Sequence, residues 1–288
     1  MQTDVPAPQN IALDFLTDFA HQLGKRDIDL PPFPDVYAKI LNALNDPDVP
    51  LDQLARMVTA APDLCVRILL VANSALMNRA GVEITDINVA VTRLGVTAVR
   101  NATVSIASKE LFDIPRNSPL RQKLDVLRAM SLKTAAYAYA LAGRSDQPAL
   151  RDDAMLTGLL HNVGSFYIIT KTEQFPEFAN EELCHTWMPG IGSALIDNWG
   201  FAEEISKAVD EQNTVEQEHF DPVNLRDILI VSKLLAEMHD SDHHETALQE
   251  LAWEKTPPLS RLGFTAENIA DKVEESADEV QSFISALS

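Results

Sequence analysis

Apolar residues recur three or four positions apart along most of this chain, which is the spacing of amphipathic helices. Residues 10–27 show it first, with Ile11, Phe15, Leu16, Phe19 and Leu23 on one stripe. Gly24 is a candidate C-cap for that helix. A proline-rich lead-in then precedes a second stripe, formed by Val36, Ile40, Leu41 and Leu44. The chain therefore opens with two predicted helices.

The next segments extend the helical pattern. Residues 51–58 form a short predicted helix, and Pro62 fits the first position of the following one. That helix, around "DLCVRILLVA", is apolar on nearly every side, so it is predicted to be central to a core. Residues 84–95 and 96–112 are rich in Val and Ile but lack alternation of period two. We interpret them as two helices broken at Gly95.

The second part of the chain is also predicted to be helical. A turn-rich break near residue 116 precedes a long Ala-rich helix over residues 121–144. Asp152 or Asp153 is a candidate cap for the helix "AMLTGLLHNVG", and Gly164 should end it or bend the chain after it. Residues 188–200 and 201–213 predict two helices split at Gly200. Residues 225–240 are clearly amphipathic, and further helices follow over 246–287. The fold class predicted is all-α, with about a dozen helices.

Composition limits the possible partners. Of 288 residues, 43 are acidic and 23 are basic, giving a formal charge of -20. That charge repels nucleic acid and anionic membranes, because both are bound largely through Lys and Arg. A cationic or mixed protein partner is compatible with it. We therefore expect a protein partner, and neither nucleic acid nor a membrane.

The cysteines and the N-terminal segment indicate the compartment of the protein. The two cysteines, Cys65 and Cys184, form neither a disulfide framework nor a zinc pattern. The start, "MQTDVPAPQN", has no basic and apolar leader, and the apolar runs are too short to span a bilayer. We expect a soluble, cytoplasmic protein.

Several segments together carry a family pattern. "LPPFPDVYAKILNALNDPDVPLDQLARMVTAAPDLCVRILLVANSA" and "ITDINVAVTRLG" resemble the N-terminal half of the HDOD domain, with the ANSA block (72–75) as the most specific part. "LTGLLHNVG" and "IGSALIDNWGFAEEI" resemble segments of the family's degenerate HD-like half. After the predicted N-terminal helix (1–27), the resemblance implies an HDOD domain (28–216, with halves 28–115 and 116–216). Helices of residues 217–288 would then pack on the HD-like core.

The same resemblance locates where an HD-type hydrolase would hold metal. Such enzymes use a His, a His-Asp pair and a later Asp, because imidazole and carboxylate hold the ion that activates water. Here only one His survives, and amide, thioether and ammonium groups replace the rest. The remnant site comprises Met130, His161, Asn162, Met188, Gln212, Asn213 and Lys233. We expect no catalytic residue, no bound metal and no cofactor, with His161 as a hydrogen-bonded core residue.

Three functions are compatible with that site. The first is a non-catalytic signalling module of bacterial regulation that binds a protein partner, which the resemblance favours. The second is a metal-dependent phosphohydrolase, an activity commonly attributed to this fold but one that needs ligands absent from the sequence. The third is a nucleotide sensor that binds a cyclic dinucleotide weakly without cleaving it. Arg128, Lys133 and Lys233 would then supply its positive charge.

Other motifs have structural explanations that we favour. Ser165 lies near His161, but no nucleophile elbow surrounds it. The glycines of "GIGSAL" (190–195) suit helix packing better than phosphate binding, since no strand precedes them. "HDSDHHE" (239–245) is interpreted as a solvated loop, with metal binding as the alternative. Asn73 and Ser74 either bond backbone carbonyls at a bend or line a pocket. Trp187 and Trp199 are predicted core anchors.

Overall fold

The computed structural model describes residues 8–25, 39–40, 43–44, 46, 49–78, 80–111, 118–199, 201–219, 221–239 and 255–287. Within those residues every regular element is a helix, so the all-α prediction is confirmed. The predicted break near residue 116, the segment 246–253 and most of the 239–245 loop lie outside the described residues. Among the helices described, none is both long and apolar enough to cross a membrane.

The N-terminal body consists of α3 (Leu51–Thr59), α4 (Pro62–Asn73) and α5 (Ile87–Leu111). Pro62 occupies the predicted first position of α4. Gly95 kinks α5 with a φ of 78°, a conformation in which only glycine is unstrained, so the predicted break is confirmed. The α4 helix was predicted to be central to a core, and it does contribute Leu64 and Ile68 to one, but Val66 and Leu70 on its other side are exposed.

Asn73 and Ser74 secure the bend after α4. The Asn73 side chain donates to the carbonyl oxygens of Leu69 (3.0 Å) and Ile84 (2.7 Å) and accepts from the Ile84 amide (2.8 Å). The Ser74 hydroxyl donates to the Val71 carbonyl at 2.8 Å. Both residues therefore bond the backbone, which was the favoured interpretation of this motif.

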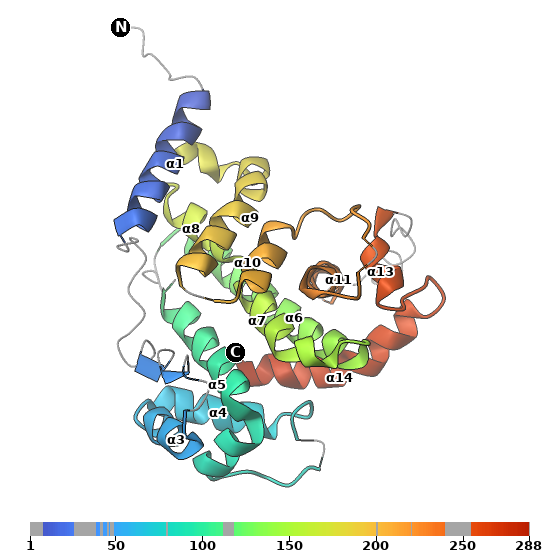
Figure 1. Ribbon diagram of the computed structural model, residues 1–288. Helices are drawn as coiled ribbons and strands as arrows, with labels where there is room; N and C mark the ends of the chain where they lie inside the picture. The colour runs from blue at the N-terminus through green and yellow to red at the C-terminus, as the bar shows by residue number, and fades with distance from the viewer. Residues whose placement is uncertain are drawn as a thin grey trace, which may run out of the picture.

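The HD-like body contains α6 (Arg121–Arg144), α7 (Arg151–Leu160), α8 (Val163–Thr170), α9 (Glu181–Asn198), α10 (Glu203–Asp210) and α11 (Leu225–Met238), with the short 3₁₀ helices η1 (Pro148–Leu150) and η2 (Pro176–Ala179) between them. In Figure 1, α6 and α7 run side by side through its centre. Small residues let them approach closely, since a Cβ on Gly158 would lie 2.6 Å from the Ala135 Cα. The predicted packing role of Trp187 and Trp199 is confirmed by their contacts with this core.

Two sequence predictions about the α7–α8 region were wrong. Asp152 and Asp153 lie in the first turn of α7, whose N-cap is Leu150, because the preceding 3₁₀ turn leads directly into the helix. Gly164 does not end a helix. The chain turns earlier, at His161 and Asn162, and Gly164 lies inside α8 where the backbone of α9 crosses it.

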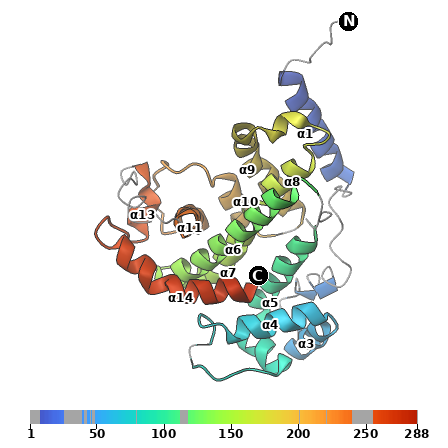
Figure 2. The same cartoon turned by 180° about the vertical axis from the view of Figure 1, so that it is seen from behind.

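The helices at both ends of the chain pack on the HD-like body. The first, α1 (Pro8–Lys25), lies beside α8 and α9 (Figure 1), where Phe15 and Phe19 enter an aromatic cluster with Tyr167, Phe175 and Phe178. At the other end, α13 (Pro257–Arg261) contacts α11, and α14 (Ile269–Leu287) contacts α6. Figure 2 shows α14 continuing to α4, where the Ala75 amide donates to the Ser282 hydroxyl at 3.1 Å. Thus α14 bridges the two helical bodies.

Candidate functional site

The seven residues of the remnant HD site lie together, although five different segments supply them. They surround or underlie one pocket of about 630 Å³. Four of the segments contribute its lining, through Met130 on α6, His161 and Asn162 after α7, Met188 on α9 and Lys233 on α11. Gln212 and Asn213, which follow α10, reach the cluster through hydrogen bonds to Lys233. The structure therefore brings the set into one polar cluster.

Lys233 is the cation of this cluster. Its Nζ donates to Gln212 Oε1 at 2.9 Å and to Asn213 Oδ1 at 3.2 Å. Burial lowers the pKa of Lys233 to about 8, while the nearby Glu237 opposes that shift. The ammonium thus lies among the positions that the resemblance assigned to the remnant site, and two neutral amide oxygens hold it there.

His161 is a neutral hydrogen-bonding residue in this setting. Its side chain is 1% exposed, and its Nδ1 lies 2.7 Å from the Gly158 carbonyl oxygen. A carbonyl only accepts, so Nδ1 carries the proton and Nε2 is the acceptor. Burial, with the positive charge of Lys233, lowers the pKa of His161 to about 3. Gln212 supports the same turn by donating to the His161 carbonyl at 3.1 Å.

Asn162 fixes α6 to this turn. Its amide nitrogen donates to the Ser131 hydroxyl at 3.3 Å and to the Leu127 carbonyl at 3.5 Å. An Asp at this position would offer only acceptors, and it could not donate to the carbonyl. The amide therefore performs a structural role here that a metal-binding carboxylate could not.

The donor set does not fit a divalent metal ion. Met130 and Met188 would offer thioethers, Asn162 and Gln212 neutral amides, and Lys233 a positive charge. Hard cations prefer carboxylates, and an ammonium in the cluster opposes any cation. In the part of the chain that the structure describes, no group of three or more His, Cys, Asp or Glu side chains could hold an ion.

Acid should destabilise the protein through His161. Its pKa is about 3 when folded and 6.5 ordinarily, so the unfolded chain binds more protons between those values. This contribution to stability is full above pH 6.5 and falls as pH drops, by about 2 kcal/mol between pH 8 and pH 5. Urea unfolding at both pH values measures it. His161→Asn, whose amide can still donate to Gly158, should lose this part of the dependence, while the exposed His185→Asn should keep it. An unchanged pH dependence in His161→Asn would contradict the assignment.

Sequence reasoning missed several residues that line the pocket, notably Cys184, His185 and Glu237. Their signal was their helical spacing, because Cys184 and His185 precede Met188 by about one turn and Glu237 follows Lys233 by one. Cys184 is not an activated thiol, since burial raises its pKa although the Ser165 hydroxyl opposes the shift. Ser165 thus has Cys184 as a neighbour. Arg128, one of the candidate charges, does not line the pocket and pairs with Asp125 at 3.2 Å.

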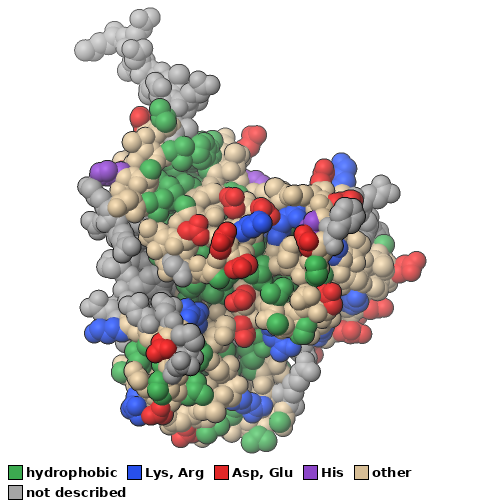
Figure 3. Space-filling view, in the orientation of Figure 1, with side chains coloured by type: hydrophobic (Ala, Val, Ile, Leu, Met, Phe, Trp, Pro, Cys, Tyr) green, Lys and Arg blue, Asp and Glu red, His purple; other side chains and the backbone are tan. Residues whose placement is uncertain are grey.

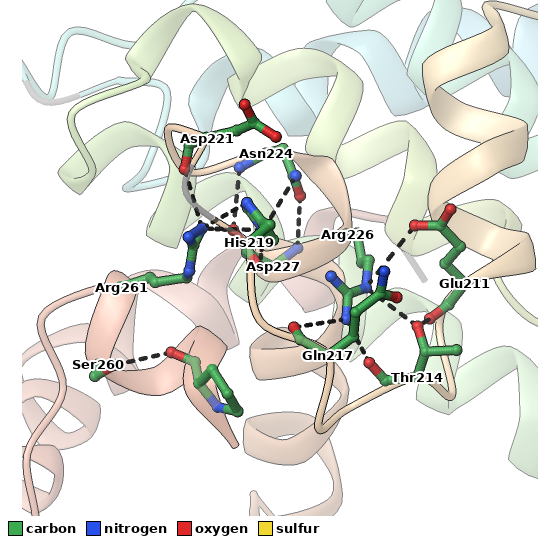
Figure 4. A network of polar contacts seen from close by, with 11 residues as sticks. Glu211, Thr214, Gln217, His219, Asp221, Asn224, Arg226, Asp227, Ser260 and Arg261 are labelled. Atoms are coloured by element: carbon green, nitrogen blue, oxygen red, sulfur yellow. Dashed lines mark hydrogen bonds and ion pairs between the residues drawn. The ribbon is translucent and has the colours of Figure 1, made fainter. Parts of the chain in front are cut away.

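A second polar network lies beyond the pocket lining (Figure 4). Asp227, which is fully buried, accepts from His219 at 3.1 Å and from Arg261 at 3.4 Å. Asp227 also forms a capping box with Asn224 at the start of α11. Arg261 comes from α13, and it donates further to the Asp221 carbonyl at 3.0 Å. This network joins α11, its preceding connection and the C-terminal helices, so its role is structural.

Arg226 lies beside that network and forms further polar contacts (Figure 4). Its guanidinium donates to the carbonyl oxygens of Thr214 and Gln217 and lies 3.9 Å from a Glu211 carboxylate oxygen. Thr214 and Gln217 belong to the irregular connection between α10 and α11. The connection is thereby held against the helix that carries Lys233.

Acidic side chains gather across the middle of the face shown in Figure 3. Asp153, Glu204 and Glu211 line a hollow of about 490 Å³ between α7, α10 and α11. Burial, reinforced by the charge of Glu204, raises the pKa of Asp153. The hollow also contains Lys207 and Arg226, so it is mixed in charge with an acidic excess.

The fold defines an all-helical protein, and the residues that the resemblance assigned to the remnant HD site lie together in it. The sequence matches the HDOD domain over residues 30–215, and the chain belongs to the HDOD domain family. The predicted family is confirmed.

Solved structures share this fold, and one curated relative is similar in sequence. The chain is similar to a Shewanella amazonensis SB2B protein named "Putative metal-dependent phosphohydrolase", with 25% identity, a TM-score of 0.72 and coverage of 97% of this chain and 100% of that one. It also matches an HDOD domain protein with unknown function from Geobacter sulfurreducens, with 22% identity, a TM-score of 0.61 and coverage of 96% and 99%. An uncharacterized protein from Treponema pallidum (strain Nichols) is 27% identical over 222 residues, or 70% of this chain. This chain spans 41% of that relative's length.

Proposed function

We propose that this protein is a non-catalytic signalling module that acts by binding a protein partner. The observation that carries the proposal is the Lys233 ammonium, held by Gln212 and Asn213 among the positions where an HD hydrolase holds its metal. A cation fixed there repels a metal ion instead of binding one. The family resemblance, which implies a regulatory role, supports the signalling part.

The acidic surface supports a protein partner with basic side chains. The net charge of -20 and the hollow lined by Asp153, Glu204 and Glu211 favour cationic or mixed contacts.

The rival function is the metal-dependent phosphohydrolase suggested by the name of the Shewanella relative. It requires a metal that the donor set does not fit. A nucleotide sensor is less favoured, because Glu181 and Glu237 offset Lys123 and Lys233 around the pocket.

Elemental analysis of protein purified without a His-tag or added metal tests the non-catalytic part. We expect less than about 0.1 equivalent of iron, manganese or zinc, because a single neutral His gives too little affinity. We also expect no hydrolysis of phosphodiesters when manganese is added. About one equivalent of metal that is lost in His161→Ala, together with hydrolysis, would overturn the proposal. The exposed His185→Ala serves as the matched control, which should leave metal content unchanged.

A further inference from the structure

The pocket above the Lys233 cluster has an apolar body. Its walls include Leu127, Met130, Ile169, Phe178 and Met188, drawn from α6, α8, η2 and α9. Val126, which is 61% exposed, stands at its rim. Its volume of about 630 Å³ is that of a small-molecule site. Apolar walls of this extent suit a ligand with a hydrocarbon portion.

The inner end of the pocket is polar and positively charged. The Lys233 ammonium has three N–H donors, and two of them are used by Gln212 and Asn213. Among the described residues, no carboxylate lies within ion-pair distance of its Nζ. His161 and Asn162 line the pocket beside it, and both are buried. One donor of a largely buried cation is therefore available to an acceptor.

The other charged groups of the pocket lie nearer solvent. Lys123, Glu181, His185 and Glu237 are all exposed, so water and salt screen their charges more strongly than that of Lys233. Glu237, one turn from Lys233 on α11, is the carboxylate that would oppose an incoming anion. An anion that reaches the inner end meets Lys233 as its main charged neighbour.

We propose that this pocket binds a small monocarboxylic acid with an aliphatic chain, the carboxylate accepting from Lys233 and the chain lying against the apolar walls. A carboxylate on a partly desolvated ammonium forms a charge-assisted hydrogen bond, which is stronger than one between neutral groups. The ligand would give the signalling module its input. That role rests on the proposed function, whereas the binding itself does not.

Proton linkage gives the binding a characteristic pH dependence. Burial lowers the pKa of Lys233 to about 8, so part of the population is neutral in mild alkali. A bound carboxylate favours the charged form and raises that pKa. Between about pH 6 and pH 7 both the carboxylate and Lys233 are charged, so affinity for the acid should be nearly constant there, and it should fall as pH rises through 8.

Titration calorimetry of the full chain with octanoate at pH 7 tests the proposal, with octanol and octylammonium as probes that share the chain but not the charge. Octanoate should bind best, and Lys233→Met should weaken it by at least about tenfold, while Lys233→Arg keeps the charge and most of the affinity. Equal binding of octanoate and octanol, tighter binding of octylammonium, or no binding of octanoate at millimolar concentration would each overturn the proposal.

A rim variant separates ligand binding from folding. Val126→Glu adds a negative charge at the exposed rim and should weaken the binding of octanoate several-fold. Its matched control is Val89→Glu, at a position on α5 that is 53% exposed and outside the pocket lining. This control should leave the affinity for octanoate unchanged. Equal affinities in the two variants would contradict the assigned site. Metal content and hydrolysis test the non-catalytic role independently of ligand binding. Either proposal can therefore be disproved without the other.

Discussion

Replacing Gly164 with alanine is expected to lower the free energy of unfolding by about 3 kcal/mol. A Cβ at this position would lie 2.0 Å from the Met188 carbonyl oxygen and 2.8 Å from the Gly192 amide nitrogen. Both are backbone atoms of α9, so no side-chain rotation can make room. Helices α8 and α9 would have to separate, and the pocket between them would lose its shape. Urea unfolding followed by circular dichroism measures the loss.

Gly190→Ala is the matched control for this substitution. Gly190 lies on α9, the helix that Gly164 contacts, and a Cβ there would meet only the Asp210 carboxylate, at 3.7 Å. Alanine favours a helix over glycine by up to about 1 kcal/mol, so this variant should be as stable as the parent or slightly more so. A loss below about 1 kcal/mol in Gly164→Ala would show that α8 and α9 can move apart easily, contrary to the close contact described.

Gly164 also shows why a sequence pattern can be right about a residue type and wrong about its role. Glycine after an apolar run indicates a helix end, and the same residue is equally needed where two helices cross closely. Local sequence does not distinguish the two, since the crossing backbone belongs to residues 188–192. By contrast, the Pro62 start and the Gly95 kink depend on backbone conformation alone, and both were predicted correctly.

The remnant site was located by resemblance, but its interactions were not predictable. Helical spacing and motif matches placed Met130, His161 and Lys233 in register with known segments. The hydrogen bonds from Lys233 to Gln212 and Asn213 join residues 21 and 20 positions apart, and they depend on how α11 docks against the end of α10. The prediction of a non-metal site stays a prediction until metal content is measured.

Asp227→Ala is the second substitution with a large expected effect. It should lower the free energy of unfolding by about 3 to 4 kcal/mol. Asp227 is fully buried and accepts from His219 and Arg261 while capping α11. Its removal leaves the partly buried Arg261 guanidinium, whose side chain is 19% exposed, without its carboxylate. Such truncations cost more than the pair contributes, because the remaining charge has no counter-ion. Urea unfolding again measures the change.

The control for Asp227→Ala is Asp125→Ala on α6. Asp125 pairs with Arg121 at 3.4 Å and Arg128 at 3.2 Å, but it is about half exposed, so its loss should cost no more than about 1 kcal/mol. If the two variants were equally stable, the network would not be holding the C-terminal helices. The contrast has a structural reason: Asp227 connects α11, the α10–α11 connection and α13, whereas Asp125 connects two side chains of its own helix. Loss of Asp227 should therefore also increase amide hydrogen exchange in α13 and at the start of α11, and Asp125→Ala should leave both unchanged.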